Sequence, residues 1–313
     1  MEVFILTPTS PIRSTGNRGT AYQWASMLEK SGYSVAVGSE LPEPLPDLLV
    51  VLHAGKCHDA AIEFKRRHPS GKLIVGLTGT DIYPAPGEAA LESMRFADAL
   101  IALQSQAPEQ IPIELRKKTH VIVQSAEQII SGTEKNADGF RVCVVGHLRN
   151  VKDPLLTAKA ARLLPAESKI QVFHAGGILE PEYEALVESE MAENPRYHWL
   201  GEQSPEETSR LLATSQLMVL SSHSEGGGRV VGEAIVHGTP VLSTRIDGIV
   251  GLLGEDYPGF YPVGDAESLA TLLQRCETDH EFFAHLQSTA DPALFSPETE
   301  SRLLSELVDS LVS

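Results

Sequence analysis

The chain has 313 residues, a length that suggests two domains of ordinary size. Hydrophobic residues make up 42% and charged residues 21%, a balance typical of a soluble globular protein and not of a disordered or collagen-like chain. Because 42 Asp and Glu outnumber 25 Lys and Arg, the net charge is -17, which argues against nucleic acid and anionic membranes as main partners.

The cysteines and the N-terminal segment indicate the cellular compartment in which the protein is expected. Three cysteines occur, widely spaced and without a C-x-x-C pair, which argues against a disulfide framework and a structural zinc site. The first residues hold a short apolar run without a preceding basic region, and nowhere do about 18 apolar residues run together. We therefore expect a cytoplasmic protein without integral membrane contact, whose oligomeric state the sequence leaves open.

Short apolar strands alternate with amphipathic helices along the first half of the chain. Strands are predicted at residues 3–6, 33–37, 48–52, 73–77, 99–103 and 120–123, and helices at 20–31, 59–67 and 89–96. The strands show little polar alternation, as expected of strands buried on both faces of a parallel sheet. The first half therefore predicts a doubly wound α/β domain.

The same alternation begins again after a polar segment at residues 126–139, which suits a linker. Strands are predicted at 140–145, 170–175, 197–200, 217–221 and 240–243, and helices at 153–164, 181–191, 205–214, 230–237 and 297–313. We therefore expect two Rossmann-like doubly wound α/β domains that face a cleft, at residues 1–132 and 133–290. A C-terminal helix within residues 291–313 could pack back on the first domain.

Ligands of open parallel sheets bind outside the carboxyl ends of the strands, so the loops there are the candidate sites. The first such loop, predicted at residues 7–19, contains Gly16, Asn17 and Arg18, and Thr20 follows it. Its glycines permit close backbone approach, and the helix N-terminus beyond can hold an anion. An ordinary loop with a helix cap is the alternative.

The third and fourth predicted strands end at His53 and near Asp81, which could face one cleft. Alternatively, Asp81 caps a turn and His53 is a core histidine with satisfied hydrogen bonds. A metal site formed by His53, Cys57 and His58 is not expected, because no second pair of ligands is evident.

Two cations, Arg149 and Lys152, follow the first strand of the second half and precede a helix. A diphosphate would find both positive charge and free N–H groups at such a position. A solvated turn with an exposed Lys152 is the alternative.

The most informative stretch is a strand that enters a triple-glycine loop at the start of a helix. Three successive glycines cost conformational entropy, which makes sense where a phosphate comes close to the backbone. Glu225 and Glu233 flank this loop, eight residues apart and separated by roughly 10 Å along an axis. Such carboxylates can accept hydrogen bonds from hydroxyls at two ends of one elongated ligand, although Glu225 could instead be a structural cap.

This Glu-x7-Glu block, followed by His237-Gly-Thr-Pro-Val, resembles the nucleotide-sugar site of the retaining GT-B glycosyltransferases of family 4. The resemblance implies that Glu225 contacts donor-sugar hydroxyls, that Glu233 binds the ribose, and that backbone near Gly201 binds the base. The segment from Gly146 to Pro154 contains an Arg and a Lys, and it is similar to the segment that carries the diphosphate-binding basic pair in that family. The implied diphosphate ligands are Arg149, Lys152 and the segment Gly227, Gly228, Arg229 and Val230.

The first half resembles the selenosugar synthases of selenoneine biosynthesis, at residues 16–25, 52–54, 77–83 and 124–126. Those enzymes join selenophosphate to the sugar of a UDP-sugar, typically UDP-N-acetylglucosamine. The resemblance implies transfer of N-acetylglucosamine or glucose to selenophosphate. We predict Glu225, Asp81 and His53 as the catalytic residues, with His53 and Asp81 orienting the sugar or acceptor. We predict that the acceptor is bound by Gly16, Asn17, Arg18, Thr20, Lys56 and Thr80, although the chain departs from the pattern of those enzymes at residues 55–57.

No Asp-x-Asp occurs in the chain, so we expect neither a metal nor a cofactor besides the UDP-sugar co-substrate. One alternative is transfer to a hydroxyl or thiol acceptor, for which Asp81 or His53 would serve as base. A UDP-sugar epimerase is less favoured, because nothing picks out its proton-abstracting carboxylates. A non-catalytic nucleotide-sugar sensor would bind UDP-sugar without releasing UDP. The preferred sugar and the anomeric outcome stay open.

Overall fold

The computed structural model describes residues 1–8, 16–129, 135 and 139–312. Their contacts divide the chain into two compact units. The first comprises Met1–Ser125, Glu225–Gly227 and Phe295–Ser313, and the second Ala126–Ser224 and Gly228–Leu294. The boundary expected between residues 132 and 133 lies outside the described residues.

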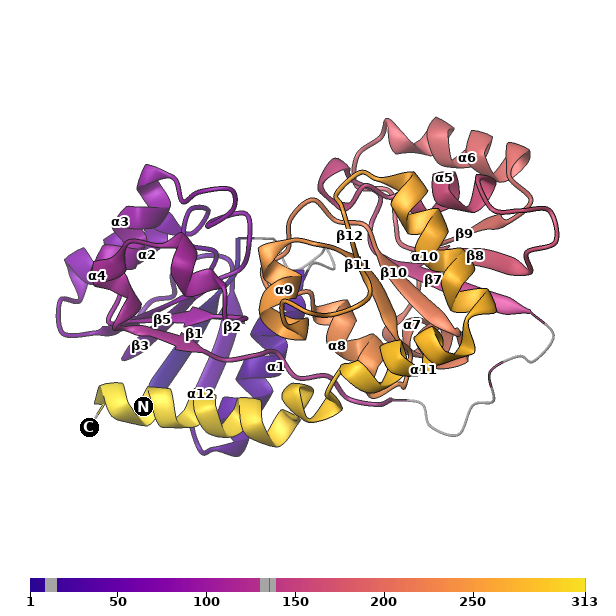
Figure 1. Cartoon of the computed structure of the whole chain (residues 1–313). Coiled ribbons are helices and arrows are strands. Elements are labelled where there is room, and N and C mark those ends of the chain that lie inside the picture. Colours follow the sequence, from indigo (N-terminus) through magenta and orange to yellow (C-terminus); the bar gives the residue numbers. More distant parts are fainter. Residues whose placement is uncertain (9–15, 130–134, 136–138, 313) are drawn as a thin grey trace. The chain divides into compact units, whose positions relative to one another are not determined.

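The first unit is built on a six-stranded parallel sheet with the strand order β2-β1-β3-β4-β5-β6 (Figure 1). Its strands are β1 (Glu2–Leu6), β2 (Ser34–Gly38), β3 (Leu48–Leu52), β4 (Lys72–Leu77), β5 (Ala99–Ala102) and β6 (Thr119–Val121). Its helices are α1 (Gly16–Lys30), α2 (His58–Arg67), α3 (Glu88–Phe96), α4 (Ile113–Arg116) and α12 (Pro297–Val312), with the 3-10 helix η1 (Ala107–Gln110).

Alternate residues of these strands enter two separate cores, as the twofold period of a strand requires. Val3 and Ile5 face a core that α1 and α12 cover, with Trp24 and Leu304 among its members. Phe4 and its alternating neighbours face the core covered by α2, α3 and α4. In Figure 1 the yellow helix α12 lies beside the indigo helix α1 of the same unit.

The second unit has its own six-stranded parallel sheet, with the order β12-β11-β10-β7-β8-β9. Its strands are β7 (Phe140–Val145), β8 (Ile170–Ala175), β9 (Tyr197–Gly201), β10 (Leu217–Leu220), β11 (Val241–Thr244) and β12 (Phe260–Tyr261). Its helices are α5 (Leu156–Arg162), α6 (Tyr183–Glu193), α7 (Pro205–Thr214), α8 (Arg229–Val236), α9 (Asp247–Leu253), α10 (Ala266–Thr278) and α11 (His280–Thr289). The 3-10 helix η2 (Asn150–Lys152) follows β7, and η3 (Pro292–Phe295) precedes α12. These two sheets confirm the predicted pair of doubly wound α/β domains.

Two predicted helix starts differ from the structure by three or more residues, each for a local reason. Helix α1 begins at Gly16, not at Thr20, because first-turn N–H groups need no intrahelical partner and glycine is tolerated there. The remaining predicted loop residues 9–15 lie outside the described part of the chain. Helix α5 begins at Leu156, because Pro154 disfavours helical backbone at the preceding Asp153, which has a φ of 41°.

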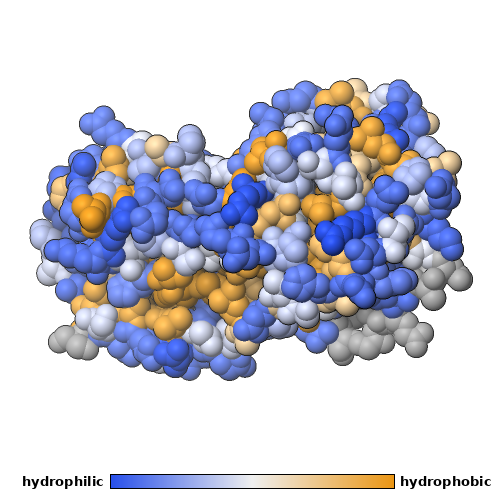
Figure 2. All heavy atoms as spheres, viewed as in Figure 1, coloured by the Kyte–Doolittle hydropathy of each residue, from blue (hydrophilic) through white to orange (hydrophobic). Residues whose placement is uncertain are grey.

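Hydrophilic residues cover most of the face drawn in Figure 2, in line with the net charge of -17. Among the helices that the structure describes, none is long and apolar enough to cross a membrane.

Candidate functional site

The strand order of the second unit identifies where a ligand would bind. The strand that follows β7 in the chain, β8, lies on one side of it in the sheet, and the strand that follows β10, β11, lies in the opposite direction. The topological switch point therefore lies between the neighbouring strands β7 and β10. The loops after them carry the predicted diphosphate ligands, and a small hollow between these loops is lined by Gly146, Lys152, Pro154, Ser221 and Ser222. The fold thus brings the predicted basic pair and the start of α8 to one edge of one sheet.

Hydrogen bonds fix the backbone of these two loops to each other. The Ser221 hydroxyl donates to the carbonyl oxygens of Lys152 and Asp153, at 2.9 Å each. The His223 amide donates to the Val151 carbonyl at 2.8 Å, and its Nε2 lies 3.5 Å from Asp153 Oδ2. The backbone that carries Lys152 is therefore held in place by the loop after β10. Sequence reasoning missed these positioning roles of Ser221 and His223, because nothing in the sequence marks which carbonyls they reach.

Buried polar atoms without a hydrogen-bond partner are concentrated in these loops. Among the described residues five such side-chain atoms occur, and three of them are Arg149 Nε, Ser224 Oγ and Arg229 Nη1. A buried donor without a partner costs about 1–3 kcal/mol, so a cluster of them is unusual. Two of the three are guanidinium donors, which match carboxylate or phosphate oxygens.

Two loop glycines are explained by close packing. Gly228 has a φ of +45°, and an added Cβ would lie 2.4 Å from Ile249 Cδ1. Within the first unit, a Cβ on Gly226 would lie 2.3 Å from the Thr78 carbonyl carbon. Gly226 is therefore required by the backbone of Thr78, and Gly228 is favoured by its left-handed backbone, while close approach of a phosphate to this loop stays a prediction.

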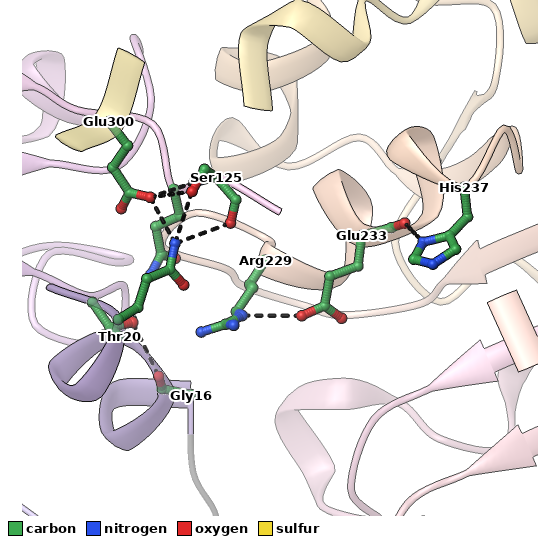
Figure 3. A network of polar contacts seen from close by, with 9 residues as sticks. Gly16, Thr20, Ser125, Arg229, Glu233, His237 and Glu300 are labelled. Carbon is green, nitrogen blue, oxygen red and sulfur yellow. Dashed lines mark hydrogen bonds and ion pairs between the residues drawn. The ribbon is translucent and has the colours of Figure 1, made fainter. Parts of the chain in front are cut away.

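Glu233 lies about one turn into α8 and is held at both its side chain and its backbone. Its Oε1 accepts a hydrogen bond from Arg229 Nε at 3.0 Å, and its backbone carbonyl accepts one from His237 Nδ1 at 2.7 Å (Figure 3). The Ser209 hydroxyl in turn contacts His237 Nε2 at 2.7 Å. The carboxylate is thus fixed near the start of α8. Contacts group Glu225 with the first unit, and Glu233 with the second.

The predicted base-binding residue Gly201 is the last residue of β9, the edge strand of the second sheet. Gly201 has a φ of +72°, and its carbonyl accepts a hydrogen bond from the Gly176 amide at 2.8 Å. Trp199 Nε1 donates to the Gly176 carbonyl, also at 2.8 Å. These bonds tie the end of β9 to the loop after β8, on the β8 side of the switch point.

A buried histidine orders the end of β7. His174 is fully buried, and its Nδ1 contacts the Tyr197 hydroxyl at 2.8 Å while its Nε2 donates to the Gly146 carbonyl at 2.9 Å. Burial lowers the pKa of His174 from 6.5 to about 4, although the bond to Gly146 opposes this shift. Sequence reasoning missed this residue, which lies inside an apolar strand.

The low pKa of His174 predicts a loss of stability in acid. Between pH 6.5 and about 4 the unfolded chain binds a proton at this site and the folded chain does not. The free energy of unfolding should therefore fall by about 3 kcal/mol through this residue as the pH drops across that window. Urea unfolding of a Trp24→Phe protein, followed by Trp199 fluorescence, measures it. A His174→Gln protein should lose this part of the pH dependence, and equal slopes in both proteins would contradict the assignment.

In the first unit, His53 closes β3 in a strained conformation. Its φ is 95°, which costs a non-glycine residue about 1–3 kcal/mol and is typical of functional sites. Its Nδ1 accepts a hydrogen bond from the Lys56 amide at 3.1 Å, so Nε2 carries the proton and donates to Thr80 Oγ1 at 2.9 Å. Burial lowers the pKa of His53, which keeps the ring neutral.

The Asp81 carboxylate is occupied by backbone donors. It is 3% exposed and accepts hydrogen bonds from the amides of Ala54, Thr78 and Gly79, at 2.8 to 3.2 Å. These bonds join the loops after β3 and β4. The geometry fits the structural alternative for Asp81 better than the role of a general base.

The remaining predicted acceptor ligands fall into two groups. Gly16, Asn17 and Arg18 form the first turn of α1, and Lys56 follows β3, next to the switch point between β1 and β3. Thr20 is buried, and its hydroxyl donates to the Gly16 carbonyl at 3.0 Å and accepts from Gln124 Nε2 at 2.5 Å. Thr20 therefore positions the first turn of α1, and its predicted role as a direct acceptor ligand stays a prediction.

A buried carboxylate on α12 completes this part of the first unit. Glu300 is 1% exposed, and its Oε1 accepts from Trp24 Nε1 at 2.8 Å. Its Oε2 accepts from Gln23 Nε2 and from the amide and hydroxyl of Ser125, at 2.6 to 2.7 Å (Figure 3). Sequence reasoning missed Glu300, although it lies four residues before Leu304 and so continues the apolar stripe of that helix.

Comparison with protein families and curated proteins points to one kind of enzyme. Residues 125–291, more than half of the chain, match the family model "Glycosyl transferases group 1". The chain is 30% identical over 148 residues to the D-inositol 3-phosphate glycosyltransferase of Mycobacterium sp. (strain KMS), a match that covers 43% of this chain and 32% of that protein. The protein of the same name from Corynebacterium kroppenstedtii is 25% identical over 183 residues, 55% of this chain and 40% of its own length. The matched region thus spans about a third of these curated relatives.

Solved structures match over the whole chain. HepE from Anabaena in complex with UDP has a TM-score of 0.79 at 17% identity, covering 99% of this chain and 100% of HepE. Sucrose-phosphate synthase from Thermosynechococcus elongatus has a TM-score of 0.81 at 17% identity, covering 99% and 98% of the two chains. At this identity the likeness establishes the fold alone.

Proposed function

The chain belongs to the group 1 glycosyl transferase family, and we propose that it moves a sugar from UDP to an acceptor that is already anionic. One observation carries the donor half of this proposal. Two guanidinium groups at the switch point of the second unit, those of Arg149 and Arg229, each have a buried nitrogen without a partner among the described residues. The start of α8 adds backbone N–H groups at the same place, so charge and geometry suit a diphosphate.

Each donor ligand has a separate role in this proposal. Arg149, Lys152 and the amides from Gly228 onward stabilise the negative charge that develops on the leaving diphosphate. Glu233 binds the ribose, and backbone at Gly201 the base. Glu225 accepts hydrogen bonds from the sugar. UDP as the nucleotide is supported by the HepE complexes, which hold UDP or UDP-glucose on a similar fold.

We propose selenophosphate as the acceptor. Selenium attacks the anomeric carbon, the bond from that carbon to the UDP oxygen breaks, and UDP leaves with the electron pair. The motifs in the first half support this choice, and so does the state of the two candidate bases. Asp81 accepts only backbone bonds among the contacts described above, and His53 is neutral with Nδ1 engaged. An acceptor that is ionised at neutral pH needs neither of them as a base.

Because the chain's own cations would neutralise the leaving group, we further propose that no metal ion is required. Turnover that disappears with EDTA and returns with Mg²⁺ would contradict this. Two other functions are tested by the same assays. If the true acceptor is a hydroxyl or thiol compound, UDP should be released from the UDP-sugar with that compound and not with selenophosphate. If the protein is a sensor, it should bind UDP-sugar and release no UDP with any acceptor.

Arg149→Met should weaken UDP binding by about 10- to 100-fold, because a charge-assisted hydrogen bond contributes about 1.5–3 kcal/mol. Isothermal titration calorimetry with UDP and no added metal measures the loss. Arg162→Met is the matched control, since Arg162 lies in the same unit and its guanidinium pairs only with Glu190 and Glu193 in the contacts described. Equal affinities of the two variants would contradict the donor site, and a wild-type protein that does not bind UDP would refute the proposed function.

A further inference from the structure

Arg229 occupies a position that a helix ordinarily disfavours for a cation. It is the first residue of α8, where the positive end of the helix dipole repels positive charge, and the first turn of α8 contains no acidic residue. The preceding Gly228 offers no side-chain cap. Positions that break a local stability rule in this way are expected at functional or strained sites.

The guanidinium of Arg229 is held at one edge. Its Nε donates to Glu233 Oε1 at 3.0 Å, whereas Nη1 is buried and has no partner among the described residues. The two side chains are 36% and 28% exposed, so the pair lies partly out of solvent. One planar group therefore orients a carboxylate and still presents a donor to an anion.

We propose that Arg229 couples recognition of the diphosphate to recognition of the ribose. Nη1 contacts a phosphate oxygen, while Nε holds the Glu233 carboxylate toward the ribose hydroxyls. This inference rests on the proposed function and adds a positioning role that the family resemblance does not give to this side chain. Loss of the guanidinium then weakens two contacts. The contact with the phosphate is lost directly, and the contact between Glu233 and the ribose is weakened because the carboxylate is no longer held in place.

Calorimetry with UDP and 2′,3′-dideoxy-UDP tests the coupling. The wild-type protein should prefer UDP, and Glu233→Gln should reduce that preference. Arg229→Met should weaken UDP binding about tenfold and also reduce the preference for UDP over the dideoxy nucleotide. Arg210→Met is the control, because Arg210 makes an ion pair at the same helical spacing with Glu206 in the same unit, and it should change neither value.

The outcomes are separable. Weaker UDP binding with an unchanged preference would show a phosphate contact without coupling, and unchanged binding would remove both roles of Arg229. Either result overturns the inference and leaves the proposed function standing, whereas a wild-type protein that binds no UDP overturns both. Should Arg229→Met fail to fold, as judged by Trp199 fluorescence, Arg229→Lys replaces it. That variant keeps the charge but not the planar fork, so it should lose the preference for the ribose hydroxyls.

Discussion

Replacing Glu300 by glutamine is expected to lower the free energy of unfolding of the first unit by about 3 kcal/mol, because the change removes a charged acceptor and leaves buried donors unpaired. The carboxylate accepts bonds from Trp24, Gln23 and Ser125, and each of its oxygens faces donors. Glutamine replaces one carboxylate oxygen by an NH2 group. That donor would then face the N–H or O–H donors of Trp24, Gln23 or Ser125 in a buried site, and no hydrogen bond could form there. Urea unfolding of a Trp199→Phe background, followed by the fluorescence of Trp24, measures the change.

Glu306→Gln on the same helix is the matched control. Glu306 is exposed and pairs with Arg302 one turn away, so its replacement should change stability by less than about 0.5 kcal/mol. If Glu300→Gln were no more destabilising than this control, the buried carboxylate would not be what holds α12 on the first unit.

Glu225→Gln is expected to lower kcat by about 10- to 100-fold while leaving UDP affinity nearly unchanged. Bonds from sugar hydroxyls to a carboxylate contribute about 1.5–3 kcal/mol, and every 1.36 kcal/mol lost from the transition state is tenfold in rate. UDP itself has no sugar to contact Glu225, so calorimetry with UDP reports folding and nucleotide binding separately from catalysis. Glu206→Gln, an exposed residue of α7, is the control. Unchanged turnover in Glu225→Gln would overturn the assignment of this residue.

Several strands and helices were predictable because a change in residue chemistry marks where each begins and ends. β3, β7, β8 and α7 begin and end at the predicted residues, since their apolar or amphipathic runs are bounded by polar or turn-forming residues. Strands buried on both faces leave no alternation, which also predicted the parallel sheets.

The segment between β11 and α12 was not predicted. β12 contains only two residues, too few for any apolar run to stand out. α10 does have a cap, since Asp265 Oδ1 accepts from the Ser268 amide at 2.9 Å, and this signal could have been found in the sequence.

Topology explains why the loops of the site could be located from the sequence, whereas the state of individual side chains could not. Arg149 and Arg229 follow neighbouring strands, so the period and order of the strands bring their loops to one edge. The sequence left Asp81 open between a site residue and a turn cap and predicted Thr20 as an acceptor ligand. Their partners in the structure are backbone amides and a distant glutamine. Backbone donors carry no sequence signature, and the Gln124 contact spans 104 residues.

The most direct test of the account is product analysis by mass spectrometry. Wild-type protein is incubated with UDP-N-acetylglucosamine or UDP-glucose and freshly made selenophosphate, without added metal. We expect UDP release that depends on selenophosphate, together with one selenium-bearing sugar, identified by its isotope pattern, for each UDP released. UDP release that is the same without selenophosphate, or UDP-sugar binding with no selenium-bearing product, would contradict selenophosphate as the acceptor.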